Sequence, residues 1–293
     1  MQIRRLSFLD RYWSNIVLLG LIAALYAPLL VHWYDGWIRK SISTEHEYFS
    51  HGVIGLPFAA NIAWYNRKRW IRLADEVGSA RLVGLGLLLV AGLFYLSGLP
   101  EPVNLSFPIL LTGVCLWLKG VSGLRLQAFA LLLVFLATPN EIPYLLAPYT
   151  MPLQSFIAGT AGFILNQFGM AVRVENIYLF VNNRLVEVAP YCAGLKMLFT
   201  SLYVGLMLLY WTNNLRSRSF CITFMIGTVL ISVTANIIRN TLLTFFHGTG
   251  QETAFHLLHD GWGGDVYSAA MLGLLIVLSN QMEKFFAPSS PES

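Results

Sequence analysis

The sequence predicts an all-α polytopic membrane protein, and three observations lead to this fold class. Of its 293 residues, 56% are hydrophobic and 12% are charged, whereas soluble domains carry about 25% charged residues. Apolar runs of membrane-spanning length recur along the chain, and most of the 19 Lys and Arg residues lie between them. We therefore expect about eight transmembrane helices, one re-entrant or interfacial segment and a small extracytoplasmic β-hairpin.

The expected spans follow from counting apolar residues, because a helix needs about 20 of them to cross the hydrocarbon core. In chain order they are residues 16–33, 51–65, 82–99, 103–118, 124–138, 191–211, 220–246 and 266–285. The first run follows Arg4, Arg5 and Arg11, as the apolar part of a signal peptide does. Because the run is long and lacks a small-residue cleavage site, we interpret it as a retained span.

A mixed region separates the fifth span from the sixth. Residues 144–170 are apolar but contain Pro148 and Pro152, which favours a re-entrant or interfacial segment. A ninth crossing is the alternative, and it would place the segments that follow on the cytoplasmic side. Residues 172–188 then alternate β-branched and polar side chains around Asn182-Asn183, a pattern that predicts a β-hairpin.

The basic residues predict the topology. Cytoplasmic loops of membrane proteins are enriched in Lys and Arg, and the clusters at residues 67–72 and 216–218 follow this bias when both termini are cytoplasmic. With eight spans, the start of the sixth span and the hairpin then lie on the extracytoplasmic face. We expect a multi-pass protein of the inner (plasma) membrane with its active site on that face.

The whole length fits one membrane domain. We expect a single integral membrane domain over residues 1–285, with an active-site core at about 140–275 and a disordered, Pro/Ser-rich tail at 286–293. The lipid bilayer is an expected partner. The net charge of +4 is modest, so nothing in the composition requires a nucleic acid.

Arg239 is the least ordinary residue within the expected spans. A guanidinium inside a membrane costs about 2.5–3.5 kcal/mol on insertion scales, and such residues are functional-site candidates. Asn236, Arg239 and Asn240 have the spacing i, i+3, i+4 and therefore share one helix face. The alternative is a structural Arg that reaches the membrane surface or pairs with a carbonyl group.

Cys192 stands at the first turn of the sixth span. A helix N-terminus and a nearby cation lower the pKa of a thiol and favour the nucleophilic thiolate; a buried packing residue is the alternative. The small pair Ala193-Gly194 leaves room for another chain, and Lys196 adds positive potential or reaches the interface. We interpret Cys115 and Cys221, which lack such surroundings, as packing residues.

Two histidines, His256 and His259, follow the seventh span. A base beside a thiol makes a Cys-His pair, and Asp260 is placed to orient the imidazole of His259. Interfacial hydrogen bonding is the alternative for both histidines. Zinc binding is a further alternative, but the HExxH pattern is absent, and we expect neither a metal nor a cofactor.

Several short motifs occur in a fixed order along the chain. They are Tyr48-Phe-Ser-His-Gly52, Val188-Ala-Pro-Tyr-Cys192-Ala-Gly-Leu195, Asn236-Ile-Ile-Arg239 and His259-Asp-Gly-Trp-Gly263. The last three resemble the Cys-(Ser/Ala)-Gly, Asn-x-x-Arg and His-x-x-x-Gly motifs of the exosortase/archaeosortase family of membrane cysteine transpeptidases. The first resembles the family's segment that enters the second span. The lead-in to the cysteine suggests the cyanobacterial branch.

The resemblance implies a Cys-His-Arg mechanism. Cys192 would attack the scissile carbonyl of a C-terminal sorting signal, Arg239 would stabilise the oxyanion, and His259 would protonate the departing amine. An acceptor activated by His259 would then resolve the thioester. The implied substrates are membrane-anchored proteins that end in a short Pro-Glu-Pro-like motif, a transmembrane helix and a basic cluster. The motifs do not specify the acceptor.

The resemblance also implies supporting or substrate-binding roles for Asn236, Lys196, Gly194 and His51. The family often has Arg at the position of Lys196, and the exchange loses bidentate geometry. Arg239 could instead bind the glutamate of the sorting motif. His256 remains the alternative base, although only His259 has a glycine four residues further on.

Two other functions fit a polytopic membrane protein. A transporter also has broken helices and charged residues within spans, but no internal repeat is visible in this sequence. A non-catalytic membrane subunit of an exopolysaccharide assembly machine is the other alternative. Either protein would tolerate the substitution Cys192→Ala, whereas a transpeptidase would lose all processing.

Overall fold

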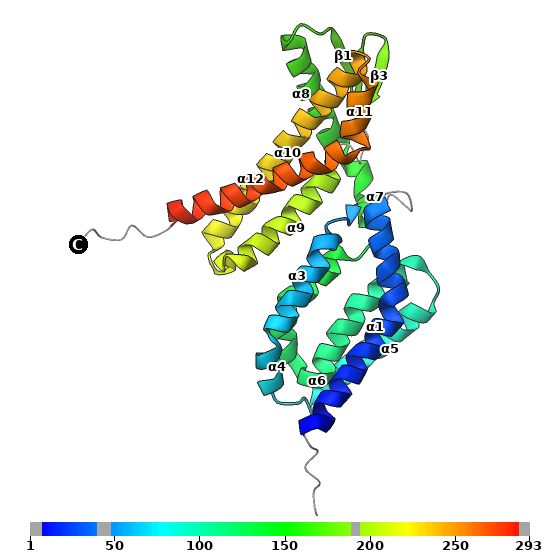
Figure 1. Cartoon of the computed structure of the whole chain (residues 1–293), viewed down its shortest axis with the longest axis vertical. Coiled ribbons are helices and arrows are strands. Elements are labelled where there is room, and N and C mark those ends of the chain that lie inside the picture. The colour runs from blue at the N-terminus through cyan, green and yellow to red at the C-terminus, as the bar shows by residue number, and fades with distance from the viewer. Residues whose placement is uncertain (1–7, 40–47, 189–193, 287–293) are drawn as a thin grey trace, which may run out of the picture. The chain divides into compact units, whose positions relative to one another are not determined.

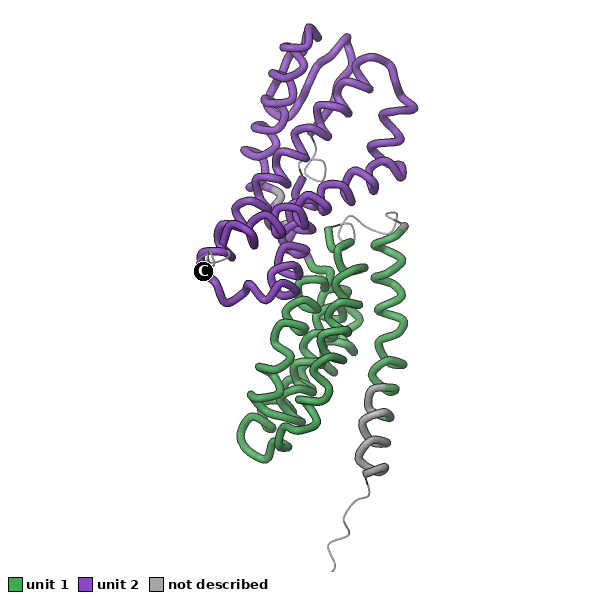
Figure 2. The backbone as a smooth tube through the Cα atoms, turned by 60° about the vertical axis from the view of Figure 1, so that its left-hand side comes forward, with its two compact units in different colours: residues 1–140 green, residues 141–293 purple. Residues whose placement is uncertain are grey.

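The computed structural model describes residues 8–39, 48–188 and 194–286, and most of them are helical (Figure 1). Contacts divide the chain into two compact units, Met1–Asn140 and Glu141–Ser293 (Figure 2). The protein is therefore mainly α-helical, as the sequence predicts. The expected single membrane domain stays a prediction.

The first unit packs its helices around one long element. Its helices are α1 (Phe8–Arg39), α3 (Gly52–Tyr65), α4 (Arg67–Arg72), α5 (Ser79–Leu96) and α6 (Pro100–Ala137). Both α3 and α5 pack against α6. Helix α6 consists of two halves that meet at Gly120, where φ is 59° and ψ is −153°. Only glycine adopts such a conformation readily, so Gly120 separates the fourth expected span from the fifth.

Buried polar side chains of the first unit bond across helices. Tyr26 in α1 donates to Ser106 Oγ in α6 at 3.0 Å, and Trp33 Nε1 donates to Asn104 Oδ1 at 2.7 Å. A buried polar group without a partner costs free energy, and no water is present in a bilayer core to replace one. These pairs therefore stabilise the contact between α1 and α6.

The second unit is built around α10. Its elements are α7 (Ile142–Leu146), a 3₁₀ turn (Ala147–Tyr149), α8 (Met151–Gln167), β1 (Val172–Glu175), β2 (Tyr178–Val181), β3 (Arg184–Glu187), α9 (Leu195–Trp211), a second 3₁₀ turn (Asn214–Arg216), α10 (Arg218–Gly248), α11 (Glu252–His259) and α12 (Trp262–Phe286). Helix α10 contacts α8, α9, α11 and α12 (Figure 1). It therefore links the segments that carry the sequence motifs.

The expected β-hairpin is present within a larger sheet. Strands β2 and β3 pair antiparallel around Asn182 and Asn183, whose φ angles of 48° and 62° are those that a two-residue hairpin turn requires. Strand β1 adds a third antiparallel strand at the outer side of β2. The single predicted hairpin was therefore incomplete, because the alternation in residues 172–175 belongs to a strand of its own.

One face of the sheet packs on α8. Leu179 and Val188 form a buried cluster with Ile157, Ala158 and Ala161 of that helix. After β3 the backbone N–H of Val188 donates to the carbonyl of Ile177 at 2.9 Å. The sheet thus holds the chain up to residue 188, directly before the cysteine motif.

Four of the described helices are long and apolar enough to cross a membrane: α5, α6, α10 and α12. Helices α3 and α9 are apolar but shorter, and the first expected span lies within α1. Helix α8, which occupies most of residues 144–170, has 17 residues and is not among the four. The chain is a membrane protein by these helices, while the count of about eight spans and the re-entrant character of residues 144–170 stay predictions.

Candidate active site

Gly194 connects the cysteine motif to α10. It is the N-terminal cap of α9 and has a φ of 81°, a left-handed conformation that side chains rarely adopt. A Cβ atom at this position would lie 2.6 Å from Cγ of Asn236. Both the backbone and the close approach therefore require glycine. Cys192, the predicted nucleophile, lies outside the described residues, as does Ala193.

The polar face predicted for α10 is present and largely buried. Asn236 and Asn240 are 1% and 3% exposed. Asn240 Nδ2 donates to the carbonyl oxygen of Asn236 at 2.9 Å and to its Oδ1 at 3.2 Å. Asn236 Nδ2, by contrast, is buried and has no hydrogen-bond partner among the residues that the structure describes. The two amides thus form a small polar site next to the start of α9.

Arg239 contacts the C-terminal end of α11. Its Nη2 donates to the carbonyl oxygens of Leu258 and His259, each at 3.3 Å. The last carbonyls of a helix lack intrahelical partners and carry the negative end of the helix dipole, so a guanidinium stabilises this end. Arg239 therefore holds the residue predicted to be the base, through its backbone.

His259 is fixed more closely than His256. His259 Nδ1 donates to Asp260 Oδ1 at 2.5 Å, and its ring stacks on Phe255 with the centroids 5.1 Å apart. His256 Nδ1 lies 3.3 Å from Asp260 Oδ2. The side chain of His259 is 28% exposed and that of His256 is 66% exposed. Of the two candidate bases, His259 is the better oriented.

The carboxylate that binds both histidines stays ionised. Partial burial raises the pKa of Asp260, but the hydrogen bonds from His259 and His256 and their charges outweigh it and hold the pKa below its ordinary value. A carboxylate that accepts from Nδ1 fixes the imidazole tautomer and leaves Nε2 for proton transfer. This arrangement suits a general acid or base.

A second charged cluster holds the other end of α11. Arg184 in β3 forms an ion pair with Glu252 and donates to the carbonyl of His247 at 3.0 Å. His247 Nδ1 lies 3.2 Å from Glu252 Oε2. Partial burial raises the pKa of Glu252, but His247 and Arg184 outweigh it and hold the pKa below its ordinary value. Sequence reasoning missed this cluster, since no local spacing links β3 to α11.

Helix α11 is thus held at both ends by arginine. None of its eight residues is buried, so apolar burial contributes little to its position. Arg184 contacts its first residue, Glu252, and Arg239 contacts its last carbonyls. We conclude that polar contacts determine where His259 and Asp260 lie.

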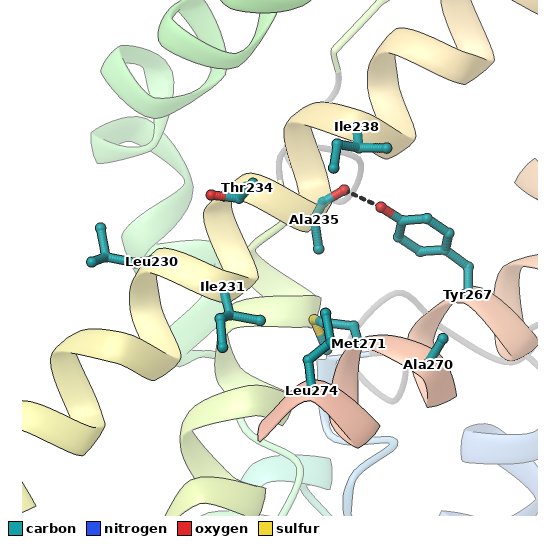
Figure 3. Close-up of a pocket in the computed structure, with 9 residues that line it drawn as sticks. All are labelled: Leu230, Ile231, Thr234, Ala235, Ile238, Tyr267, Ala270, Met271 and Leu274. Carbon is teal, nitrogen blue, oxygen red and sulfur yellow. Dashed lines mark hydrogen bonds between the residues drawn. The ribbon is translucent and has the colours of Figure 1, made fainter. Parts of the chain in front are cut away.

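An apolar groove of about 410 Å³ runs between α10 and α12 (Figure 3). Ile231, Ile238 and Leu274 are among its lining residues. Tyr267 crosses it and donates from its hydroxyl to the carbonyl of Ala235 at 2.5 Å (Figure 3). The groove occupies the turns of α10 that precede Arg239, so an apolar surface adjoins the polar site.

The other predicted residues are distributed as follows. Lys196 lies in the first turn of α9 and is partly buried. His51 belongs to the first unit, where it is buried and its Nε2 donates to the carbonyl of Leu136 at 3.1 Å. Over residues 8–39, 48–188 and 194–286, no group of three or more His, Cys, Asp or Glu side chains is arranged to hold a metal ion. The supporting roles of both residues stay predictions.

Comparison with known proteins gives one match. The family model described as transmembrane exosortase matches residues 33–276. Neither the curated proteins nor the solved structures yield a match. The matched region contains the cysteine motif, the polar face of α10 and the His259 segment, and it covers most of the chain. The protein therefore belongs to the transmembrane exosortase family.

Proposed function

We propose that the protein is a membrane cysteine transpeptidase that cleaves the C-terminal sorting signals of membrane-anchored proteins. One observation carries this proposal: three motifs that are far apart in the sequence meet in the second unit. Gly194 contacts Asn236, and Arg239 contacts His259. Because Cys192 precedes Gly194 by two residues in the sequence, we assign it as the nucleophile that acts with this arginine and this oriented histidine.

The chemistry follows from these residues. The Cys192 thiolate attacks the scissile carbonyl, and the carbonyl electron pair moves onto oxygen. When the electron pair returns, the C–N bond breaks, and the imidazolium of His259 gives its proton to the departing amine. A thioester remains. His259 then accepts a proton from the acceptor nucleophile, which attacks the thioester and releases the thiolate.

Arg239 has two roles in this mechanism. Its contacts with the α11 carbonyls use Nη2, and a guanidinium carries five N–H donors in a fixed geometry. Arg239 is therefore able to hold α11 and also to stabilise the oxyanion or bind the glutamate of the sorting motif. We assign it both a positioning and an electrostatic function.

The substrate class follows from the groove and the motifs together. A sorting signal with a short polar motif followed by a transmembrane helix needs an apolar surface beside a polar site. The groove between α10 and α12 adjoins Arg239 and supplies that surface. We propose that the site faces the extracytoplasmic side of the plasma membrane.

Substitution of each cysteine tests the proposal. A secreted protein ending in Pro-Glu-Pro, an apolar run and an Arg cluster is co-expressed with the wild type or with a variant, and its shortening is followed by mass. Cys192→Ala is expected to abolish processing, because the nucleophile is removed. Cys115→Ala and Cys221→Ala serve as matched controls and should process normally. Equal shortening by the wild type and Cys192→Ala would refute the enzyme assignment.

A further inference from the structure

Asn236 carries a buried hydrogen-bond donor without a partner. The residue is 1% exposed, and within residues 8–39, 48–188 and 194–286 its Nδ2 finds no hydrogen-bond acceptor. A donor left unpaired inside a protein costs about 1–3 kcal/mol, and such groups are few in native structures. A fold that retains one next to a functional motif suggests that its acceptor comes from a ligand.

The orientation of this amide is fixed by its neighbour. Asn240 Nδ2 donates to Asn236 Oδ1 and to the carbonyl oxygen of the same residue. The reversed amide would place two NH₂ groups against each other, and neither group accepts hydrogen bonds. Asn236 Nδ2 is therefore the end that points away from Asn240.

That donor lies against the start of α9. A Cβ atom on Gly194 would stand 2.7 Å from Asn236 Nδ2, so only glycine lets the start of α9 approach this donor so closely. Gly194 is the N-terminal cap and provides no side-chain oxygen to the helix. The first N–H groups of a helix lack intrahelical acceptors and carry the positive end of its dipole. The N-terminus of α9 and the side-chain donor of Asn236 thus lie next to each other.

We propose that Asn236 Nδ2 and the N-terminus of α9 together bind the carbonyl oxygen of the peptide bond that is cleaved. Asn236 is then the side-chain donor of the oxyanion hole. The inference rests on the proposed function, since Gly194 follows Cys192 by two residues. Negative charge develops on that oxygen when the thiolate attacks and disappears when the C–N bond breaks. A prearranged donor stabilises the anion more than the neutral carbonyl.

Two residues of α10 then have different roles. Arg239 Nη2 is bound to the end of α11, one turn away from Asn236, so Arg239 orients the base in addition to supplying positive charge. Asn236 acts on the reacting carbonyl itself. Thr244 also has a buried hydroxyl without a partner, but it stands eight residues further on, about 12 Å along the helix at 1.5 Å per residue, and serves as a matched control.

The test compares Asn236→Leu and Asn236→Asp with Thr244→Val in the full-length chain. Turnover of the sorting-signal substrate is measured together with the thermal midpoint. Asn236→Leu is expected to lower kcat about 10²–10³-fold, the usual effect of removing one oxyanion-hole donor, with a much smaller change in KM. Its thermal midpoint should equal or exceed that of the wild type, because an unpaired donor has been removed and Asn240 Nδ2 keeps its 2.9 Å hydrogen bond to the backbone carbonyl oxygen of residue 236. Thr244→Val should keep full turnover.

The outcomes separate this inference from the proposed function. Wild-type kcat in Asn236→Leu, in a chain whose Cys192→Ala variant is inactive, overturns the inference alone. If Asn236→Leu does not accumulate, Asn236→Asp decides, since it keeps an acceptor for Asn240 and replaces the donor by a carboxylate oxygen that cannot stabilise an oxyanion; full turnover there overturns the assignment equally. If Cys192→Ala processes substrate as the wild type does, the proposed function fails and this inference fails with it.

Discussion

Each unit of the protein contains a buried asparagine, and the two asparagines, Asn104 and Asn236, differ in their hydrogen bonds. In the first unit, Tyr26 bonds to Ser106 and Trp33 bonds to Asn104, so these groups are satisfied between helices of the same unit. In the second unit, Asn236 Nδ2 and the Thr244 hydroxyl are buried and have no hydrogen-bond partner in the described part of the chain. The first unit also contains an unpaired group, since Trp37 Nε1 is buried and has no hydrogen-bond partner among the described residues. Satisfied pairs stabilise a fold, whereas an unpaired donor beside a motif is available for a ligand.

A similar contrast separates two neighbouring helices of the second unit. Helix α10 buries residues along its length, including Phe224, Asn236 and Leu243, whereas no residue of α11 is buried. Elements with few buried contacts belong to the low-stability end of a protein. The proposed base, His259, therefore lies on an element that depends on two arginines, and substitutions there should affect activity more than overall stability.

The largest effect is expected at Arg239. Arg239→Gln removes both the contact with the α11 carbonyls and the charge near the reacting oxygen, so we expect a loss in kcat of about 10³-fold. Arg239→Lys should recover little, since an ammonium lacks the planar, forked geometry of a guanidinium. Steady-state processing assays measure both. Wild-type turnover in Arg239→Gln would show that α11 holds its position without this contact.

The matched control for Arg239 lies in the first unit. Lys119 is also a buried cation, and its Nζ donates to Asp75 and to the carbonyl of Leu73, each at 2.7 Å. Lys119→Met should lower the thermal midpoint, because both acceptors lose their donor, and should leave turnover per folded molecule unchanged. If Lys119→Met lost as much kcat as Arg239→Gln does, Arg239 would not differ in role from a structural cation of the first unit.

A smaller effect is expected at Asp260. In a buried catalytic triad, removing the carboxylate costs about 10⁴ in kcat. The side chain of Asp260 is 64% exposed, so water partly replaces its contact, and we expect a loss of about 10²-fold in Asp260→Asn. Because Asp260 orients the base without contacting the substrate, KM should change little.

The pH dependence follows from the lowered pKa of Asp260. Its ordinary value is 3.8, and a carboxyl group whose pKa is lowered on folding contributes stability that is present above that value and is lost as pH falls through the lowered one. Above about pH 5, Asp260 is therefore ionised throughout. The thermal midpoints of the wild type and Asp260→Asn should therefore differ above about pH 5 and converge as pH falls below 3.8. A difference of the same size at low pH would contradict this contribution of Asp260.

The next effect in size concerns the ion pair at the start of α11. Arg184→Glu and Glu252→Arg should each lower turnover about fivefold, since a partly exposed pair contributes little but here holds an element without buried residues. The double variant exchanges the charges and should restore much of the activity. Full activity in each single variant would show that Arg239 alone determines the position of α11.

Sequence reasoning recovered the features that depend on local geometry. The spacing of Asn236 and Asn240 predicted a shared helix face, and their hydrogen bond is consistent with it. Asn182 and Asn183 predicted a turn, since both tolerate positive φ angles. Helical periodicity and turn chemistry act over a few residues, which is why a single sequence is sufficient for them.

Features that depend on long-range packing were not predictable. Arg184 and Glu252 are 68 residues apart, and their pairing depends on how β3 and α11 pack beside α10. The unpaired donor of Asn236 likewise depends on the approach of Gly194. Local patterns indicated which side chains were chemically unusual. They did not show which of these side chains the fold would satisfy and which it would leave for a ligand.

The smallest effect on activity is expected from Asn104→Leu, and its comparison with Asn236→Leu is the sharpest test of the contrast between the units. Asn104→Leu leaves Trp33 Nε1 buried without its acceptor, which costs about 1–3 kcal/mol and should lower the thermal midpoint, while turnover per folded molecule stays at the wild-type level. Asn236→Leu should instead lower turnover and leave the thermal midpoint at or above the wild-type value. Thermal unfolding and kcat measured on both variants separate the two roles, because the same substitution removes a structural acceptor in one unit and a ligand donor in the other.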